Sequence, residues 1–172
     1  MSIFLGLFDG HNASASVLCD GRIEKAFQEE RLSRTKNHFG PPVQATQEIL
    51  AHLGAAPADV DKVCLVSHYV PAPRHPRSIK DLFDDRYKSG ARQRLVRTFA
   101  NSNFYRALRS RQRMQQRRAT VAEWGFDPNR IEFCDHHQAH AASAYYGLRK
   151  DDQPYLILTL DGGGDGLSGS VW

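Results

Sequence analysis

The sequence predicts a mixed α/β fold, and two observations carry that prediction. Apolar runs with strand periodicity recur between turn residues at 3–8, 13–19 and 22–29, which indicates three consecutive antiparallel strands. Helix and strand patterns then alternate, with a helix at 43–53, strands at 63–66 and 131–134, a helix at 136–149 and a strand at 154–160. An antiparallel meander followed by helix–strand alternation is typical of a sheet with helices packed on it.

Turn and capping residues set the bounds of the N-terminal elements. Asp20-Gly21 is a strong hairpin signal between the second and third strands. Pro41-Pro42 precedes the helix at 43–53, and Gly54 follows it, as expected of the start and the stop of a helix.

The C-terminal part of the sequence predicts a strand, a turn and another strand. The apolar run at 154–160 predicts a buried strand. A glycine-rich turn is expected at Asp161–Gly166, and the next strand begins at Leu167. The sequence stops inside that strand, so we expect it to be the N-terminal portion of a longer protein.

Charge is distributed unevenly along the chain. The segment from Arg86 to Arg118 holds eleven Lys and Arg and no Asp or Glu, so it carries +11. The remainder holds twelve basic residues against all nineteen acidic ones, a net charge of −7. The pattern predicts helices at about 79–88 and 91–123, and we favour a solvated basic insertion or a cover that faces acidic residues elsewhere. The alternative is nucleic-acid binding through phosphates, with aromatic side chains stacked on bases.

Composition limits the class of protein. The 172 residues are enough for one domain or for half of a larger one, and 24% charged residues are typical of a soluble globular protein. The sequence has no apolar run long enough to span a bilayer, and its N-terminus lacks the basic start of a secretory signal. The three cysteines lie far apart and are expected to be buried, reduced thiols. These features predict a cytoplasmic protein without a membrane partner.

Two histidines and an aspartate form the strongest candidate site. His136 and His140 are four residues apart on the expected helix, so both project from one face, while His137 points elsewhere. Asp161 follows a strand, at an edge where open α/β sheets bind ligands. Two imidazole nitrogens and a carboxylate suit Fe(II), Zn or Mn, and spacing alone does not choose among them. The alternative is a helix N-terminus capped by Asp135, with the histidines as hydrogen-bonding surface residues.

Three further segments carry candidate binding groups. The turn Asp161–Gly166 exposes backbone N–H groups that can cradle a phosphate, although a plain hairpin turn is the simpler interpretation. His11 lies in a polar turn among small residues and is a candidate general base, with a solvent-facing histidine as the alternative. The run Glu29–Lys36 is either a solvated loop or an anion-binding corner, whose basic side chains are Arg31, Arg34 and Lys36.

In this order and combination, the motifs resemble one family. The matching segments are Gly10–Ala15, Asp20-Gly21, Glu29–Arg31 with Arg34 and Lys36, His136–Ala144 and Leu158–Gly162. They are similar to the N-terminal part of the O-carbamoyltransferases that act on antibiotics, toxins and nodulation factors. The resemblance covers residues 3–53 and 130–172, and it matches 70–125 only as a helical insertion.

The resemblance implies an actin-like ATPase (ribonuclease H-like) fold, with this chain as its first subdomain. The implied core is 1–70 and 128–172, and the implied helical insertion is about 71–127. In this family a YrdC-like domain makes carbamoyladenylate from carbamoyl phosphate and ATP. That domain and the second actin-like half lie outside this sequence, so the rest of the same polypeptide or a partner chain is needed for activity.

The resemblance also implies a role for each candidate residue. The metal is Fe(II) or another divalent ion, and its ligands are His136, His140 and Asp161. His11 lies beside the acceptor, a hydroxyl of a small-molecule natural product, and accepts its proton. Contacts to ATP or carbamoyladenylate, with Mg²⁺ as a further candidate ion, fall on Gly162, Gly163, Gly164 and Asp165. Substrate contacts fall on Asn12, Arg31, Arg34 and Lys36.

Two other functions are compatible with the sequence. A tRNA threonylcarbamoyl transferase has the same fold and would use the basic segment to bind tRNA, although nucleic acid is not an expected partner of the carbamoyltransferase. A non-catalytic half-domain would instead dock a partner through the helices at 86–118. The sequence leaves open the acceptor and whether the chain forms a homo-oligomer.

Overall fold

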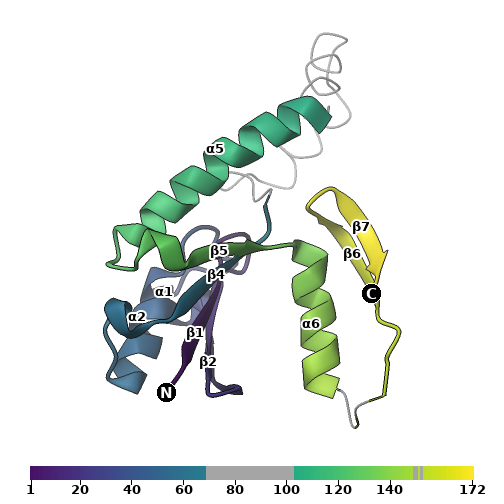
Figure 1. The fold of residues 1–172 in the computed structure, drawn as a ribbon. Helices are drawn as coiled ribbons and strands as arrows, with labels where there is room; N and C mark the ends of the chain where they lie inside the picture. Colours follow the sequence, from purple (N-terminus) through teal and green to yellow (C-terminus); the bar gives the residue numbers. More distant parts are fainter. Residues whose placement is uncertain (69–102, 149–150, 152) are drawn as a thin grey trace.

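The computed structural model describes residues 1–68, 103–148, 151 and 153–172 (Figure 1). Its main sheet has five strands in the order β3-β2-β1-β4-β5. The first three strands form the expected antiparallel meander, as β1 (Ile3–Phe8), β2 (Ser14–Cys19) and β3 (Arg22–Gln28). Two further strands run parallel to β1, namely β4 (Lys62–Val66) and β5 (Ile131–Cys134).

The strand directions identify the class of this sheet. Because β2 is antiparallel to both β1 and β3, and because β4 and β5 are parallel to β1, only β2 is reversed. An order of 3-2-1-4-5 with the second strand reversed is that of the ribonuclease H-like fold, to which the actin-like ATPases belong. The α/β class and the actin-like fold expected from the sequence are therefore confirmed.

One face of the sheet is buried by helix α2 (Val43–Leu53), which packs on β2 and β3. The bounds of α2 match the prediction, and Gly54 ends it at a φ of 60°, where its N–H bonds the carbonyls of Leu50 and Ala51. Burial of each large aliphatic side chain contributes about 1.5–3 kcal/mol. The most buried of these residues are Leu5, Leu7, Val17, Ile49, Val60, Val63, Leu65 and Ile131.

The residues after β3 form a helix where a solvated loop was the simpler expectation. Helix α1 spans Glu29–Ser33, and the Glu29 residue is only 2% exposed. Its carboxylate accepts hydrogen bonds from the backbone N–H groups of Gln44 (3.1 Å) and Ala45 (2.8 Å). These bonds cap α2, whose N-cap residue Pro42 has no side-chain cap of its own. Capping therefore explains why this carboxylate is buried.

The C-terminal elements stand beside the main sheet. Helix α6 (His136–Leu148) follows β5, and β6 (Leu158–Gly164) and β7 (Leu167–Val171) form a separate antiparallel hairpin (Figure 1). The helix expected at 136–149 is confirmed over 136–148, and the strand from Leu167 is confirmed as well.

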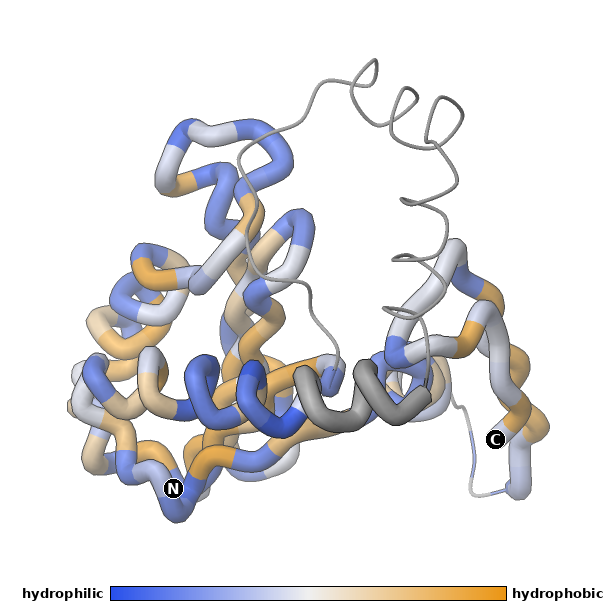
Figure 2. Tube along the Cα trace, turned by 90° about the horizontal axis from the view of Figure 1, so that it is seen from above, coloured by the Kyte–Doolittle hydropathy of each residue, from blue (hydrophilic) through white to orange (hydrophobic). Residues whose placement is uncertain are grey.

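Two expectations for this hairpin are wrong. Strand β6 begins at Leu158 instead of 154 and continues through the glycines to Gly164, so the turn is only Asp165-Gly166. The strand is also not buried, since Leu158 and Leu160 are 64% and 79% exposed. Figure 2 shows apolar stretches near the C-terminus, apart from those of the main sheet. An apolar run predicts a strand here, but it does not indicate what covers that strand.

The described half of the basic segment forms helix α5 (Asn103–Ala122), which supports the expected helix at 91–123 over these residues. The Arg117 guanidinium makes two 2.7 Å contacts with the Asp9 carboxylate at the end of β1. It also donates to the carbonyls of Val66 and Ser67 at the end of β4. This part of the basic segment therefore covers the ends of β1 and β4 and pairs with an acidic residue there, as one of the expectations had it. Residues 79–88 and 91–102 lie outside the described residues.

Two other expectations can be compared with the structure. In the described part of the chain, no helix has both the length and the apolar character of a membrane span. All three cysteines are free thiols, with Cys19 buried and Cys64 and Cys134 half-buried. Cellular location stays a prediction.

Replacing Arg117 with alanine is expected to lower the free energy of unfolding by about 3 kcal/mol, because Asp9 would be left nearly buried without its partner. The two side chains are only 10% and 12% exposed. Urea denaturation measures the effect. Arg111→Ala on the same helix is the matched control, since Arg111 is exposed. An equal decrease of the unfolding free energy in both variants would contradict the stabilising role of this ion pair.

Candidate metal centre

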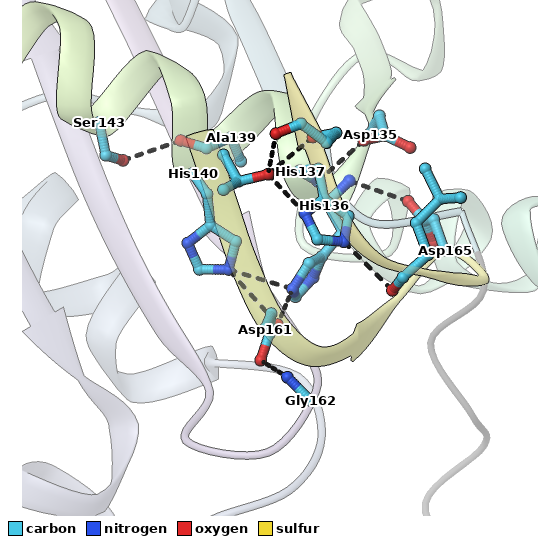
Figure 3. A network of polar contacts seen from close by, with 12 residues as sticks. Asp135, His136, His137, Ala139, His140, Ser143, Asp161, Gly162 and Asp165 are labelled. Carbon is cyan, nitrogen blue, oxygen red and sulfur yellow. Dashed lines mark hydrogen bonds and ion pairs between the residues drawn. The ribbon is translucent and has the colours of Figure 1, made fainter. Parts of the chain in front are cut away.

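The structure brings together the three residues expected to bind a metal. The Nε2 atom of His136 lies 2.6 Å from Oδ2 of Asp161, and His140 Nε2 lies 3.6 Å from the same oxygen. The two Nε2 atoms are 3.1 Å apart. Figure 3 shows both rings on one face of α6, turned toward Asp161 on β6. The i, i+4 spacing on the helix thus positions the pair as the sequence predicted.

The cap expected in the alternative interpretation is present at the start of α6. Asp135 accepts hydrogen bonds at Oδ1 from the backbone N–H groups of His137 (2.8 Å) and Gln138 (3.1 Å). Such a cap satisfies donors that the first helical turn leaves free. The two interpretations are compatible, because the cap fixes the start of α6 and the histidine side chains project from that fixed turn.

His137 points away from the cluster and holds the hairpin against α6. The residue is fully buried, with Nδ1 at 2.8 Å from Thr159 Oγ1 on β6 and Nε2 at 3.2 Å from the Leu167 carbonyl on β7. A carbonyl only accepts, so Nε2 donates to Leu167. The His137 ring thereby joins both strands of the hairpin to the helix that carries His136 and His140.

The glycines of β6 serve the cluster in different ways. A Cβ atom on Gly164 would lie 2.0 Å from Cδ2 of His136, so the ring occupies the space that a side chain would need. The Gly162 N–H donates to Oδ1 of Asp161 at 2.5 Å, and a Cβ on Gly162 would meet no atom within 4 Å. Contacts of these glycines or Gly163 with a nucleotide stay a prediction.

Asp165 makes internal hydrogen bonds. Its side chain is 1% exposed, and Oδ1 accepts from the Ser67 hydroxyl (2.6 Å) and the His68 N–H (2.8 Å). Oδ2 accepts from the backbone N–H of His136 at 2.9 Å. Sequence reasoning assigned Asp165 to the nucleotide and missed Ser67 and His68, since no local pattern relates residues 98 positions apart. His68, Asp135 and Asp165 also form a second group of close potential ligand atoms.

The Asp161 carboxylate is ionised at neutral pH. The hydrogen bond from His136 lowers the pKa of Asp161 below its usual range, and the bond from the Gly162 N–H and the charges of the two histidines lower it further. An ionised carboxylate is the form that binds a cation, so this electrostatic arrangement favours the ligand role.

The donor set fits a divalent transition metal. Bonds of about 2.0–2.2 Å to nitrogen and oxygen place ligand atoms roughly 3–3.5 Å apart, close to two of the three distances in the cluster. Two imidazoles and one carboxylate with further positions open are the ligand set of many Fe(II) sites. These three residues would therefore hold such an ion.

His11 lies near this cluster, across the ring of Phe8. The His11 and Phe8 rings are 5.9 Å apart between centroids, and Phe8 lies 6.4 Å from His136, with both pairs edge-to-face. The His11 side chain is exposed in the turn after β1. The expected general base and the expected metal ligands thus approach the same aromatic side chain.

The remaining predicted substrate residues belong to the same edge of the sheet. The loop that carries Arg34 and Lys36 reaches the His11 turn through a bridge between His11 and Phe39. Arg34 ends α1 at a φ of 58°, Arg31 is 76% exposed beside Glu30, and Asn12 has a φ of 56°. The structure therefore places Asn12 in the turn that holds His11, and Arg34 and Lys36 in the segment that leads to the bridge at Phe39. Arg31 lies on α1, and a role of these residues in binding substrate stays a prediction.

Comparison with known proteins gives clear relatives by sequence, although no family model matches the chain. The chain is 30% identical over 169 residues to nodulation protein NolNO of Sinorhizobium fredii, covering 92% of this chain and 20% of that protein. The chain is homologous to one part of NolNO. This match confirms the resemblance that the motifs indicated.

Other relatives extend the match. The chain is also 27% identical to uncharacterized protein sll1178 of Synechocystis and 26% identical to uncharacterized protein MJ1051 of Methanocaldococcus jannaschii. These matches cover 94% and 96% of this chain, and 25% and 23% of the relatives. The chain therefore spans about a fifth to a quarter of the curated relatives it matches.

Solved structures give weaker matches. YeaZ from Pseudomonas aeruginosa superposes with a TM-score of 0.39 and 15% identity, over 86% of this chain and 50% of that one. A protein described as similar to peptidase YEAZ from Pseudomonas aeruginosa gives 0.41 and 16%, over 99% and 65%. These scores are too low to carry an argument, so the fold assignment depends on the order and directions of the strands.

Gly164→Ala is expected to displace the His136 ring and to cost about 1–3 kcal/mol of stability, because the new Cβ overlaps the imidazole. Side-chain ¹⁵N–¹H correlation spectra report the His136 environment, and urea denaturation reports the stability. Gly162→Ala in the same strand is the matched control and is expected to leave the His136 signals unchanged. Unchanged His136 signals in Gly164→Ala would contradict the packing described here.

Proposed function

We propose that this chain forms part of an O-carbamoyltransferase that transfers a carbamoyl group from carbamoyladenylate to a hydroxyl of a small-molecule natural product. The observation that carries the proposal is the cluster of His136, His140 and Asp161, together with the contacts of both His136 and His11 with the ring of Phe8. Homology to a nodulation protein over 92% of the chain supports it, since enzymes acting on nodulation factors belong to the carbamoyltransferases that the motifs resemble.

Each site residue has a defined task in this proposal. His136, His140 and Asp161 hold a divalent ion, which we take to be Fe(II). When bound, the ion orients the adenylate phosphate and offsets its charge. His11, as a neutral imidazole, accepts the proton of the acceptor hydroxyl while that oxygen attacks the carbamoyl carbon. The products are the carbamate ester and AMP, and the proton remains on His11 until solvent removes it.

The rest of the machinery is proposed to come from outside this sequence. The chain spans about a fifth of NolNO, and in the family that the motifs resemble a YrdC-like domain supplies carbamoyladenylate from ATP and carbamoyl phosphate. A second actin-like half would then close the site from the side of β6 and β7, where Leu158 and Leu160 are exposed. The rest of the same polypeptide is the simplest source of both parts.

The basic segment is given no nucleic-acid role in this proposal. In its described half, Arg117 pairs with Asp9, and Arg118 donates to the Ile131 carbonyl at 3.0 Å. Both guanidinium groups also lie over the Phe133 ring, at 5.2 and 5.7 Å from its centroid. Side chains engaged in this way support packing of α5 on the sheet instead of binding to tRNA.

His11→Ala in the complete enzyme is expected to lower carbamoyl transfer about 10²–10⁴-fold, the usual contribution of a general base. Synthesis of carbamoyladenylate from ATP and carbamoyl phosphate is expected to continue, because it does not use His11. Mass spectrometry of the adenylate and of the carbamoylated product separates the two steps. His52→Ala, which changes an exposed histidine in the last turn of α2, is the matched control.

Two results would contradict this proposal. Loss of both steps in His11→Ala would remove the specific role of His11. Full transfer activity in that variant would mean that another group accepts the proton.

A further inference from the structure

We infer that Asp165 is a positioning residue, which sets the distance between His136 and Asp161 by joining the end of β4, the start of α6 and the β6–β7 turn. This inference rests on the metal site proposed above. It gives Asp165 a role that differs from the nucleotide contact expected from the sequence.

The first step of the argument is the set of bonds that the carboxylate accepts. Oδ1 receives the Ser67 hydroxyl at 2.6 Å and the His68 N–H at 2.8 Å, both from the segment directly after β4. Oδ2 receives the His136 N–H at 2.9 Å, at the first residue of α6. Hydrogen bonds to an ionised acceptor are shorter and stronger than neutral ones. One side chain therefore holds two elements of the main body to the turn of the hairpin.

The second step is the position of the metal ligands relative to these bonds. Asp165 accepts from the backbone of His136, and His136 is itself a proposed ligand. Asp161 lies four residues before Asp165 in the same hairpin. The Asp165 carboxylate therefore restrains the hairpin close to the residue that places Asp161 Oδ2 at 2.6 Å from His136 Nε2. Figure 3 shows Asp165 and Asp161 on either side of the His136 residue.

The third step is that the remaining links between hairpin and helix do not fix His136. His137 bonds Thr159 and Leu167, so it ties the strands to the next residue of α6, and neither bond involves the backbone of His136. Gly164 restricts the position of the His136 ring only through close packing, without a hydrogen bond. The bond from the His136 N–H to Asp165 supplies the directional restraint.

The backbone conformation suggests a substitution that tests this inference. Asp165 has a φ of 48°, in the left-handed region that asparagine also adopts readily. Asp165→Asn keeps the shape and the backbone, but it replaces one carboxylate oxygen with an NH₂ group. In one orientation of the amide the NH₂ group faces the His68 N–H, and in the other it faces the His136 N–H. In either case one backbone donor loses its acceptor.

The test is a titration of the complete protein with Co(II), followed by its visible absorption. Asp165→Asn is expected to weaken Co(II) binding about ten- to a hundredfold, as is usual when a group that orients a ligand is changed. It is also expected to alter the Co(II) absorption bands, which report coordination geometry and which loss of stability alone does not move. Asp127→Asn is the matched control, since Asp127 also accepts a backbone N–H in a turn, that of Asn129.

Each outcome decides between the two proposals. Wild-type affinity and bands in Asp165→Asn, with binding lost in Asp161→Ala, would overturn the positioning role and leave the metal site standing. Absence of Co(II) binding by the wild-type protein would overturn both. If Asp165→Asn does not fold, Ser67→Ala takes its place, because it removes one of the bonds that hold the carboxylate. A three- to tenfold weaker affinity with shifted bands in Ser67→Ala supports the role, and wild-type behaviour overturns it.

Discussion

The hydrogen bond between Ser67 and Asp165 joins the two parts of this molecule that carry the proposed chemistry. Ser67 is buried with a φ of 73°, a conformation that costs a non-glycine residue about 1–2 kcal/mol. Its polar groups offset that cost, because its N–H bonds the Cys134 carbonyl at 2.7 Å, its carbonyl accepts from Arg117 and its hydroxyl donates to Asp165. Through these bonds the His11 turn, held by Asp9 and Arg117, is connected to the helix that bears the histidine cluster.

This arrangement explains why the site lies at the edge of the sheet. Strands β1, β4 and β5 are parallel, so Asp9, Ser67 and Asp135 all follow the carboxyl ends of neighbouring strands. Open α/β sheets bind ligands at such ends. The hairpin then contributes Asp161 from outside the main sheet, and Leu158 and Leu160 of the same strand are exposed.

The parts that the sequence predicted are those governed by local rules. Helix α2 could be bounded from Pro42 and Gly54, and the spacing of His136 and His140 placed both rings on one face. The capping role of Glu29 and the bond between Ser67 and Asp165 were missed, because they join residues 15 to 98 positions apart. The burial of β6 was predicted wrongly because an apolar run indicates a strand without indicating what covers it.

The central claim is that His136, His140 and Asp161 hold a divalent ion that carbamoyl transfer requires. Elemental analysis of the complete protein, purified without oxygen, tests it together with a transfer assay. The account predicts about one iron or equivalent divalent ion per chain in the wild type, and neither bound ion nor transfer in His136→Ala/His140→Ala. Wild-type metal content in that double variant, or full transfer by metal-free protein, would contradict the account.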